Sequence, residues 1–425
     1  MTDNPDLNSS PDLNSSPDLN SNPDLIIRVA AKGDGATADG RHVPMAAPGD
    51  VIAPDGSLIH GPDHAEPVCR HFPACGSCQL QHLTDRALAA YVGDRVAGAA
   101  RGQGIDPGTM PPAHVSPPQT RRRATLHAQA IGKRVVVGFR EGGSHRVVDL
   151  KACAVMLPEL FALVAPLRDL LTRRADRKLV VDIAMTRADQ GVTLDLSGLV
   201  TEGLAATEAM LDFARDHALA RLTIDSGYGP ETVWEPEPVT ITLGGQQGGG
   251  TPVSLPPGAF LQATADGEAA LGSAACEWLA GAATVADLFS GLGTFAFALA
   301  RGGAKVLAVE AARDAHLSCQ AAARTWGRPV HAMHRDLFRN PLQTEELDRF
   351  AAVLLDPPRA GAREQVAQIA ASRVARVVYI SCNPASWARD AATLIAGGYR
   401  LADLRAVGQF RWSTHVELAS LFLRD

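Results

Sequence analysis

Cys382 is the residue best placed for covalent chemistry, in the sequence Tyr379-Ile380-Ser381-Cys382-Asn383-Pro384. It directly follows the apolar run from Val374 to Ile380, which predicts a strand. In an open parallel α/β sheet, ligands bind outside the carboxyl ends of the strands, so a thiol at that edge faces the site. The pattern predicts a nucleophile. A buried, inert cysteine is the alternative that this residue alone leaves open.

Acidic residues follow other apolar runs in the last third of the chain. The segment from Asp287 to Gly293 has an apolar strand before it and two glycines that let the backbone approach a ligand closely. Glu310 ends the next run about 20 residues later, where a carboxylate can accept hydrogen bonds from both hydroxyls of an unphosphorylated ribose. Asp336 and Asp356 follow two further runs. Because the third glycine of a dinucleotide site is missing, the pattern favours an adenosyl ligand without phosphates over NAD.

Four cysteines of the N-terminal half are spaced like metal ligands. Cys69, Cys75 and Cys78 fall in one short segment, where Gly76 permits a tight turn, and Cys153 supplies a fourth thiol. An all-sulfur site suits zinc or an iron–sulfur cluster. Structural zinc sites favour two close pairs of ligands, so the three-plus-one arrangement favours [4Fe–4S].

A cationic segment lies between the third and fourth of these cysteines. It opens with Arg121-Arg122-Arg123 and alternates apolar and polar residues as far as Phe139. Further cations recur along it, namely Lys133, Arg134, Arg140 and Arg146. Since alternate residues of a strand share one face, several of these cations could line a solvent face and follow a phosphate backbone. An ordinary solvated strand face is the alternative.

Composition limits the class of protein that these residues serve. The chain has 425 residues, of which 46% are hydrophobic and 20% charged, and this predicts two to three globular domains. No apolar run approaches the roughly 18 residues of a membrane span, and no secretory signal is recognisable, so we expect a cytoplasmic protein. Its net charge of −6 argues against a protein that coats nucleic acid non-specifically. Seven cysteines in a reducing compartment are more typical of ligands or catalytic groups than of disulfides.

Several of these motifs together carry a family resemblance. They are Asp287-Leu-Phe-Ser-Gly-Leu-Gly293, Glu310, Asp356-Pro-Pro-Arg359, Ser381-Cys-Asn-Pro384 and Val416-Glu417. In combination they resemble the RNA 5-methyluridine methyltransferase family, which uses S-adenosylmethionine, over residues 256–425. The four N-terminal cysteines make the chain similar to the branch that carries a [4Fe–4S] cluster and modifies 23S ribosomal RNA.

The resemblance implies a role for each matching residue. Cys382 would add to carbon 6 of uracil, and Glu417 would remove the proton from carbon 5 after methyl transfer. A thiol is intrinsically nucleophilic, so a small depression of the Cys382 pKa is expected to suffice. Phe260 could stack on a nucleotide. The pocket of the methyl donor would be lined by Gln262, Phe289, Thr294, Glu310, Asp336 and Asp356. Thr264 and Thr294 stand where the family often has asparagine.

The predicted fold is α/β with four regions. Residues 1–24, with a repeated Pro-Asp-Leu-Asn-Ser-Ser motif, are predicted to be a disordered tail. Residues 25–65 resemble a truncated TRAM domain, a small OB-like β barrel that binds RNA, and residues 66–255 form a central α/β RNA-binding domain with the cluster site. Residues 256–425 form a doubly wound, Rossmann-like class I methyltransferase domain.

RNA is the expected partner, 23S ribosomal RNA above all, with no membrane and a monomeric chain. Two alternatives stay open within the same chemistry: methylation of a transfer-RNA uridine, or of carbon 5 of an RNA cytidine. A third, from another class, is a non-catalytic iron–sulfur RNA-binding protein or redox sensor. It would keep the fold without needing Cys382.

Overall fold

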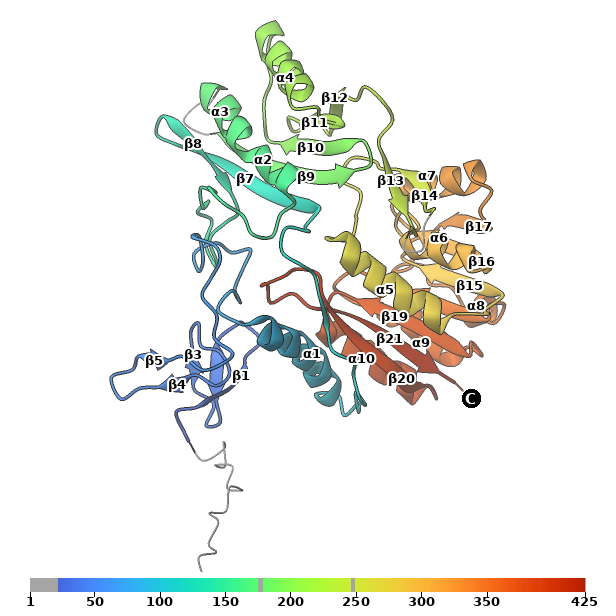
Figure 1. Cartoon of the computed structure of the whole chain (residues 1–425). Helices are drawn as coiled ribbons and strands as arrows, with labels where there is room; N and C mark the ends of the chain where they lie inside the picture. Colours follow the sequence, from blue (N-terminus) through green and yellow to red (C-terminus); the bar gives the residue numbers. More distant parts are fainter. Residues whose placement is uncertain (1–21, 175–178, 246–248, 425) are drawn as a thin grey trace, which may run out of the picture. The chain divides into compact units, whose positions relative to one another are not determined.

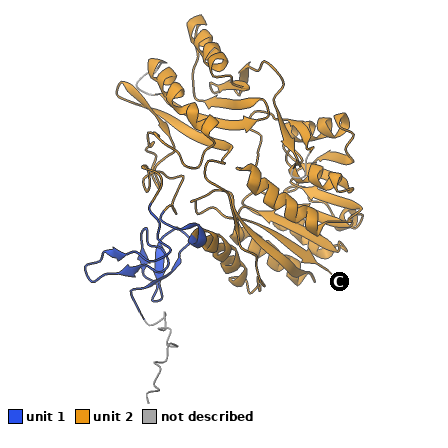
Figure 2. Ribbon diagram, viewed as in Figure 1, with its two compact units in different colours: residues 1–66, 82–87 blue, residues 67–81, 88–425 orange. Residues whose placement is uncertain are grey.

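The computed structural model describes residues 22–174, 179–245 and 249–424. The predicted disordered tail therefore lies outside the described residues as far as residue 21. The chain forms two compact units, one of residues 1–66 and 82–87 and the other of residues 67–81 and 88–425 (Figure 2). The boundaries predicted after residues 24, 65 and 255 stay predictions.

The first unit contains short strands, in agreement with the small β region expected there. One three-stranded sheet and one two-stranded sheet are built from β1 (Ile26–Val29), β2 (Gly35–Thr37), β3 (His42–Val43), β4 (Val51–Ile52) and β5 (Leu58–Ile59). Asp50 is fully buried between them and accepts hydrogen bonds from the backbone N–H groups of Ala47 and Gly61, each at 2.7 Å. Such a buried carboxylate fixes the loops that join the short strands.

A six-stranded sheet organises the middle of the chain. Its order is β12-β11-β10-β9-β7-β8, and the sheet is antiparallel except for the parallel pair β10 and β11. The strands are β7 (Arg123–Ile131), β8 (Arg134–Gly138), β9 (Val180–Ala188), β10 (Gly191–Ser197), β11 (Arg221–Asp225) and β12 (Glu231–Trp234). The helices of this region are α2 (Pro158–Ala162), α3 (Val164–Arg174) and α4 (Leu204–Asp216) (Figure 1).

The cations of β7 and β8 do not form the single solvent-facing row that the alternation suggested. Arg122 is buried, and its Nη2 forms an ion pair with Glu268 at 2.5 Å. Lys133 and Arg134 lie at the hairpin tip where β8 begins, whereas Arg140 lies just beyond the opposite end of β8. For Arg122 the prediction was wrong, because a buried partner in the last third of the chain outweighed the local period-2 pattern.

The last third forms most of an eight-stranded, doubly wound sheet, as predicted. Its order is β17-β16-β15-β18-β19-β21-β20-β6, and β21 runs antiparallel to both of its neighbours. The strands are β6 (His114–Val115), β15 (Thr284–Leu288), β16 (Lys305–Glu310), β17 (Val330–His334), β18 (Ala352–Leu355), β19 (Arg376–Ser381), β20 (Arg400–Gly408) and β21 (Glu417–Leu423). The strand order reverses at β15, so a ligand crevice is expected outside its carboxyl end.

Helices cover both faces of this sheet and explain the alternation within its strands. Val378 and Ile380 of β19 belong to the buried core shared with α5 (Ala265–Trp278), α6 (Thr294–Arg301) and α7 (Arg313–Thr325). The residue between them, Tyr379, points to the other face, where its hydroxyl donates a hydrogen bond to Asp390 at 2.8 Å. That face carries α9 (Arg363–Ala371) and α10 (Pro384–Ala396).

The remaining elements connect these layers. They are α1 (Asp85–Arg101), the hairpin of β13 (Thr240–Leu243) and β14 (Thr251–Ser254), and α8 (Thr344–Leu347). Among the described residues, none of the helices has both the length and the apolar character needed to cross a bilayer.

Candidate active site

The pairing of β19 with β21 determines where Cys382 and Glu417 lie. Ser381 is paired with Leu418 in antiparallel register. Continuing this register by one residue places Cys382, which directly follows β19, opposite Glu417, the first residue of β21. Directly opposite residues of an antiparallel pair point to the same face of the sheet with their Cβ atoms about 5 Å apart. The predicted nucleophile and the predicted base are therefore neighbours at one edge.

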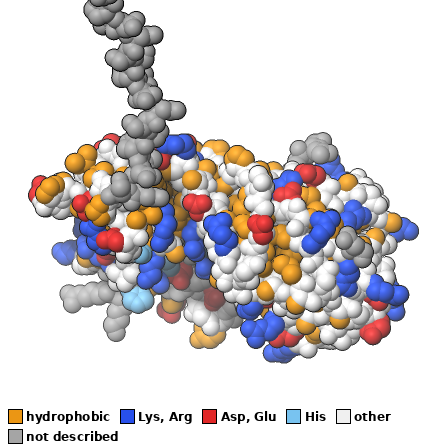
Figure 3. All heavy atoms as spheres, turned by 90° about the horizontal axis from the view of Figure 1, so that it is seen from below, with side chains coloured by type: hydrophobic (Ala, Val, Ile, Leu, Met, Phe, Trp, Pro, Cys, Tyr) orange, Lys and Arg blue, Asp and Glu red, His pale blue; other side chains and the backbone are white. Residues whose placement is uncertain are grey.

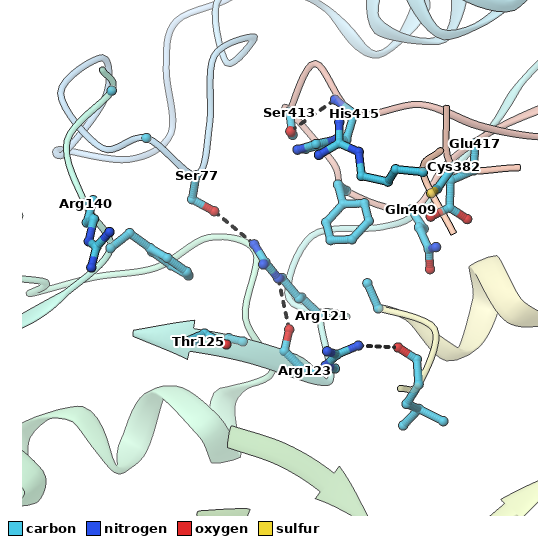
Figure 4. Close-up of a pocket in the computed structure, with 18 of the residues that line it drawn as sticks. Ser77, Arg121, Arg123, Thr125, Arg140, Cys382, Gln409, Ser413, His415 and Glu417 are labelled. Atoms are coloured by element: carbon cyan, nitrogen blue, oxygen red, sulfur yellow. Dashed lines mark hydrogen bonds between the residues drawn. The ribbon is translucent and has the colours of Figure 1, made fainter. Parts of the chain in front are cut away.

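Both side chains line a cavity of about 600 Å³. Figure 4 shows the Cys382 sulfur beside the Glu417 carboxylate, with the amide of Gln409 next to them. The cavity is also lined by Arg121, Arg123, Arg140, Phe260, Arg359, Phe410 and His415. A volume of this size can accept an extruded nucleotide, and the walls offer cations and aromatic rings.

The electrostatics of Cys382 contradict the small pKa depression expected for it. Burial, and then the nearby carboxyl groups of Glu417 and Asp356, raise the pKa of Cys382 to about 11. Arg359 acts in the opposite direction and lowers the pKa. In the protein without substrate, Cys382 is therefore a thiol at neutral pH. The sequence predicts Glu417 and Asp356 at this edge but not their effect on the pKa of Cys382.

The carboxyl groups of this edge are themselves perturbed. Burial raises the pKa of Glu417 to about 7, although a hydrogen bond from Gln409 opposes this shift. Burial, together with the charges of Glu417 and Asp287, raises the pKa of Asp356 well above its usual range. A carboxylate with a pKa near neutrality suits a general base, because it is ionised at working pH yet holds a proton well.

Two buried glutamines connect Glu417 to Asp356. Gln409 donates a hydrogen bond from Nε2 to Oε1 of Gln262 at 2.7 Å, and Gln262 Nε2 approaches Asp356 Oδ2 at 3.5 Å. Both glutamine side chains are nearly inaccessible, with exposed fractions of 3% and 2% for Gln262 and Gln409. Gln262 itself does not line the cavity. It lies behind the wall, between Gln409 and the end of β18.

The glycine turn after β15 is tied to the acidic end of β16. Glu310 accepts hydrogen bonds from the backbone N–H groups of Gly291 at 2.9 Å and Ala312 at 2.6 Å. Gly293 has a φ of 90°, and a Cβ atom there would come within 2.8 Å of the Phe297 ring, so only glycine fits without strain. The turn leaves the α6 N-terminus and the Glu310 carboxylate side by side.

The other residues predicted to hold the methyl donor gather at the same edge but outside the cavity. The Phe289 ring lies 5.3 Å from the Phe338 ring in a tilted arrangement, just after β15. Asp336 follows β17 and accepts from the N–H of Phe338 at 3.0 Å, and Thr294 is the first residue of α6. These residues thus lie at or just beyond the ends of β15 and β17 and at the start of α6, and their role in holding the methyl donor stays a prediction.

The four predicted metal ligands are free thiols in segments that are hydrogen-bonded to one another. Close to Cys69, His71 Nε2 accepts from the N–H of Lys151 at 2.9 Å, which brings the first cysteine segment to the segment of Cys153. Burial is the first cause of the raised pKa values of Cys75, Cys78 and Cys153, and the charge of Cys69 raises all three further. Within the part of the chain that the structure describes, no three His, Cys, Asp or Glu side chains converge closely enough to hold a metal ion. The metal site stays a prediction.

The cysteine segment is also bonded to the loop that precedes Glu417. The N–H groups of Gln79 and Leu80 both donate to the carbonyl oxygen of Trp412, at 2.7 and 2.9 Å. The side chain of Gln79 accepts from the N–H of Thr414 at 3.3 Å. These contacts hold the loop between β20 and β21 in place, so the region of the cysteines contributes to the position of the base.

Arg121 joins the same two regions through its side chain. Its guanidinium lies 5.4 Å from the Phe139 ring and 5.3 Å from the Phe410 ring, and it donates to the hydroxyl of Ser77 at 3.0 Å (Figure 4). A cation held between two aromatic faces is stabilised by both ring quadrupoles. Arg121 therefore connects Ser77, Phe139 and Phe410, which all line the cavity.

Sequence reasoning missed Gln409, Arg359 and His415 as cavity residues. Arg359 belongs to a motif that was recognised, but its approach to Cys382 depends on how the loop after β18 folds. Gln409 and His415 lie in a loop with no strand-end signal of the kind that marked Cys382. Their nearness to Glu417 in sequence was the only available clue.

Comparison with known proteins agrees with this geometry. A family model for tRNA (uracil-5-)-methyltransferases matches residues 330–425. An RNA methyltransferase of Zymomonas mobilis is 47% identical over 399 residues, which cover 94% of this chain and 99% of that protein. The 23S rRNA (uracil(1939)-C(5))-methyltransferase RlmD of Pectobacterium carotovorum is 32% identical over 378 residues, which cover 87% of this chain and 82% of that protein.

The chain belongs to the RNA (uracil-5-)-methyltransferase family. A solved structure, the Pyrococcus abyssi tRNA (uracil-54, C5)-methyltransferase in complex with S-adenosyl-L-homocysteine, has the same fold, with a TM-score of 0.71 over 94% of this chain and 99% of that chain at 20% identity. The family resemblance and the class I S-adenosylmethionine-dependent fold predicted for this RNA methyltransferase are thus confirmed.

The raised pKa of Cys382 predicts how its thiol reacts in this methyltransferase. Only the thiolate reacts with iodoacetamide, so at about pH 8 Cys382 should be alkylated slowly. Replacing Glu417→Gln removes a nearby negative charge and should speed alkylation by roughly tenfold, the effect of about one pKa unit. Arg359→Ala should slow it. Mass spectrometry of the Cys382 peptide measures the rates, with the Cys276 peptide as internal reference. Equal rates in all three proteins would contradict the electrostatic account.

Proposed function

We propose that this protein transfers a methyl group from S-adenosylmethionine to carbon 5 of a uridine in RNA, with Cys382 as nucleophile and Glu417 as base. The observation that carries this proposal is the cross-strand pair itself. A thiol and a carboxyl group with a pKa of about 7 share one face of the sheet and line one cavity. We expect the protein to act in the cytoplasm, where its RNA is found.

The chemistry requires both groups in sequence. Carbon 5 of uracil is a poor nucleophile, so the Cys382 thiolate first adds to carbon 6, and the electrons of the 5,6 double bond become an enolate. Carbon 5 then attacks the methyl group, and S-adenosylhomocysteine leaves. Glu417 takes the proton from carbon 5, the double bond forms again, and the carbon–sulfur bond breaks to return the thiolate.

The proton of Cys382 must pass to solvent before addition, because Glu417 has to stay free to take the proton from carbon 5. Asp356 and Glu417 disfavour the thiolate, whereas Arg359 favours it. When substrate contacts Glu417 and Asp356, or when they are protonated, they repel the negative charge of the Cys382 thiolate less. The pKa of Cys382 then falls, and more of it is thiolate. The thiol in the free protein is thus a resting form, which protects a reactive sulfur until substrate enters.

The residues around the glycine turn suit the methyl donor. The carboxylate of Glu310 has lone pairs left after accepting two backbone N–H groups, and it lies where ribose hydroxyls are bound in such folds. We assign the donor to Gln262, Phe289, Thr294, Glu310, Asp336 and Asp356. Bound there, it supplies the activated methyl group. The residues of this chain orient it towards Cys382.

The cavity wall is suited to RNA despite the net acidic charge. Arg123 lies 5.1 Å from the ring of Phe260, and that ring is 60% exposed, which offers a stacking platform backed by a cation. On the face drawn in Figure 3, Lys and Arg side chains lie in separate groups among acidic ones. This distribution favours recognition of one folded site over coating of the backbone. Flipping the target base out of its stack costs a few kcal/mol.

Two observations favour 23S ribosomal RNA as the substrate. The relative named RlmD covers most of this chain, and the four cysteines are those expected of the ribosomal branch. Transfer RNA is the second candidate, favoured by the family model and the Pyrococcus abyssi structure. We choose the ribosomal substrate because its relative is more similar in sequence.

We further propose that Cys69, Cys75, Cys78 and Cys153 hold a [4Fe–4S] cluster. In a tetrahedral zinc site all four sulfurs lie about 2.3 Å from one ion. A cubane assigns one thiolate to each of four irons, so its ligands stand farther apart. The three-plus-one spacing of the cysteines, and the electrostatic effect of Cys69, Cys75 and Cys153 on the Cys78 thiol, support this set of ligands for a cluster. Gln79 and Leu80 are bonded to the loop between β20 and β21, residues 409–416, which we call the base loop. A cluster beside them would therefore have a structural role, because it would support this loop.

Replacing the nucleophile Cys382 and replacing the base Glu417 should stop the reaction at different steps. Cys382→Ala should abolish methylation, because no thiol can activate carbon 5. Glu417→Gln should slow product formation by about 10²–10⁴-fold and leave methylated RNA covalently attached to Cys382, because the carbon 5 proton stays in place. Denaturing gels and mass spectrometry detect the adduct. Cys276→Ala, which removes a cysteine outside the cavity, is the matched control. Methylation by the Cys382→Ala protein would overturn the role of Cys382, and an absence of methylation by the wild-type protein would favour the non-catalytic alternative.

The substrate can be identified in a strain that lacks the gene for this protein. We expect one 5-methyluridine to disappear from 23S ribosomal RNA and to return when the wild-type gene, but not the Cys382→Ala gene, is restored. Nucleoside mass spectrometry of separated RNA fractions is the measurement. If 5-methyluridine disappears from transfer RNA instead, the substrate is a transfer-RNA uridine. If 5-methylcytidine disappears, the substrate is an RNA cytidine.

The cluster predicts the metal content of protein purified without oxygen. We expect about four irons and four sulfides per chain, lost on Cys75→Ser or Cys153→Ser but retained on Cys276→Ser. Chemical iron and sulfide assays measure this independently of activity. One zinc ion per chain, with no sulfide, would overturn the assignment.

A further inference from the structure

Gln409 occupies a defined position relative to Glu417. Val407 of β20 is paired with Glu417 of β21. Gln409 lies two residues beyond Val407, so it points to the same face and is a diagonal neighbour of Glu417. Cys382 lies opposite Glu417 on the other side. The base is therefore enclosed between the thiol from β19 and an amide from the end of β20, as Figure 4 shows.

The orientation of the Gln409 amide follows from one unambiguous donor. The backbone N–H of Thr264 can only donate, and it donates to Oε1 of Gln409 at 3.3 Å. Nε2 of Gln409 must then point the other way, where it donates to Oε1 of Gln262 at 2.7 Å. A glutamine amide has two N–H donors, so a second remains for the Glu417 carboxylate. This orientation leaves one N–H of Gln409 for Glu417, in agreement with the hydrogen bond from Gln409 that lowers the pKa of that carboxyl group.

We propose that Gln409 is a positioning residue for the reaction, which holds the Glu417 carboxylate ionised and directed at carbon 5 of the target base. The inference rests on the proposed function. An amide donor favours the charged form of a carboxylate and fixes which of its oxygens is free. The free oxygen is then left to take the proton that must depart after methyl transfer.

Other charged groups near Glu417 do not replace this donor. Cys382 and Asp356 face it from the ends of β19 and β18, and each disfavours a second negative charge. Arg359 and His415 line the same cavity. Burial, and then the charges of Arg359 and Arg121, lower the pKa of His415, so its imidazole carries no positive charge at working pH. Without Gln409, the buried carboxylate would lose its hydrogen-bond donor in this network.

The test measures two events separately: release of the hydrogen from carbon 5 and transfer of the methyl group. Full-length protein is given RNA with tritium at carbon 5 of uridine and labelled S-adenosylmethionine, in single turnovers across a range of pH. Gln409→Met keeps the length of the side chain but removes the donor. Tritium release should then require a pH about one unit higher, the effect of losing one hydrogen bond to a charged group. Methylated adduct should accumulate below that pH, and release should recover above it.

The control variant is Gln365→Met. Gln365 is another buried glutamine, bonded to the backbone of Leu342 and distant from the cavity lining, so its loss removes similar amide contacts without touching the base. Its pH midpoint should equal that of the wild type. Gln409→Glu gives a second test if the first variant is unstable, because a carboxylate at 409 should raise the midpoint further.

The outcomes separate this inference from the proposed function. If the wild-type protein releases no tritium from any RNA fraction, the proposed function fails. If it releases tritium and Gln409→Met keeps the wild-type midpoint and leaves no adduct, the proposed function stands and the role of Gln409 is overturned. A uniform loss of rate at every pH would also overturn it, because such a loss indicates only structural damage.

Discussion

The antiparallel pairing of β21 beside β19 is the constraint on which the site depends. The parallel strands of the sheet all end at one edge, and an antiparallel strand begins there, so its first residue meets their last ones. This arrangement brings Glu417 to Cys382 across 35 residues of sequence. A slip of one residue would turn Glu417 to the opposite face. Leu421 and Phe422, buried on opposite sides of β21, hold the register through the cores that they fill.

The same edge concentrates acids in a buried environment. Burial is the first cause of the raised pKa values of Asp287, Asp356 and Glu417. Nearby carboxyl groups raise the pKa values of Asp287 and Asp356 further. Such an arrangement costs stability and is typical of functional sites. It suits a reaction in which a sulfonium cation approaches and a proton must later be taken up. Glu417, whose pKa is raised to about 7, can both take up and release a proton near neutral pH.

The sequence predicted those parts of the site that depend on local signals. Cys382, Glu310 and Asp356 stand at the ends of apolar runs, and parallel strands bring such ends together whatever the loops do. It did not predict the burial of Arg122, whose partner Glu268 lies on a distant helix, nor the raised pKa of Cys382, which depends on acids from two other strands. Gln409 was missed for the same reason. Its role comes from a diagonal contact between strands, and single-sequence periodicity contains no such information.

The base loop also explains why a cysteine segment far away in sequence belongs to this site. The loop between β20 and β21, residues 409–416, carries Gln409 and His415, leads directly to Glu417 and lacks regular secondary structure. Its carbonyl at Trp412 is bonded to two successive N–H groups of the cysteine segment, and Arg121 packs against it from the central sheet. A catalytic carboxylate needs placement within about 0.5 Å, which a free loop cannot provide. The cluster proposed for the four cysteines would stiffen the segment that supports this loop without contacting the target base.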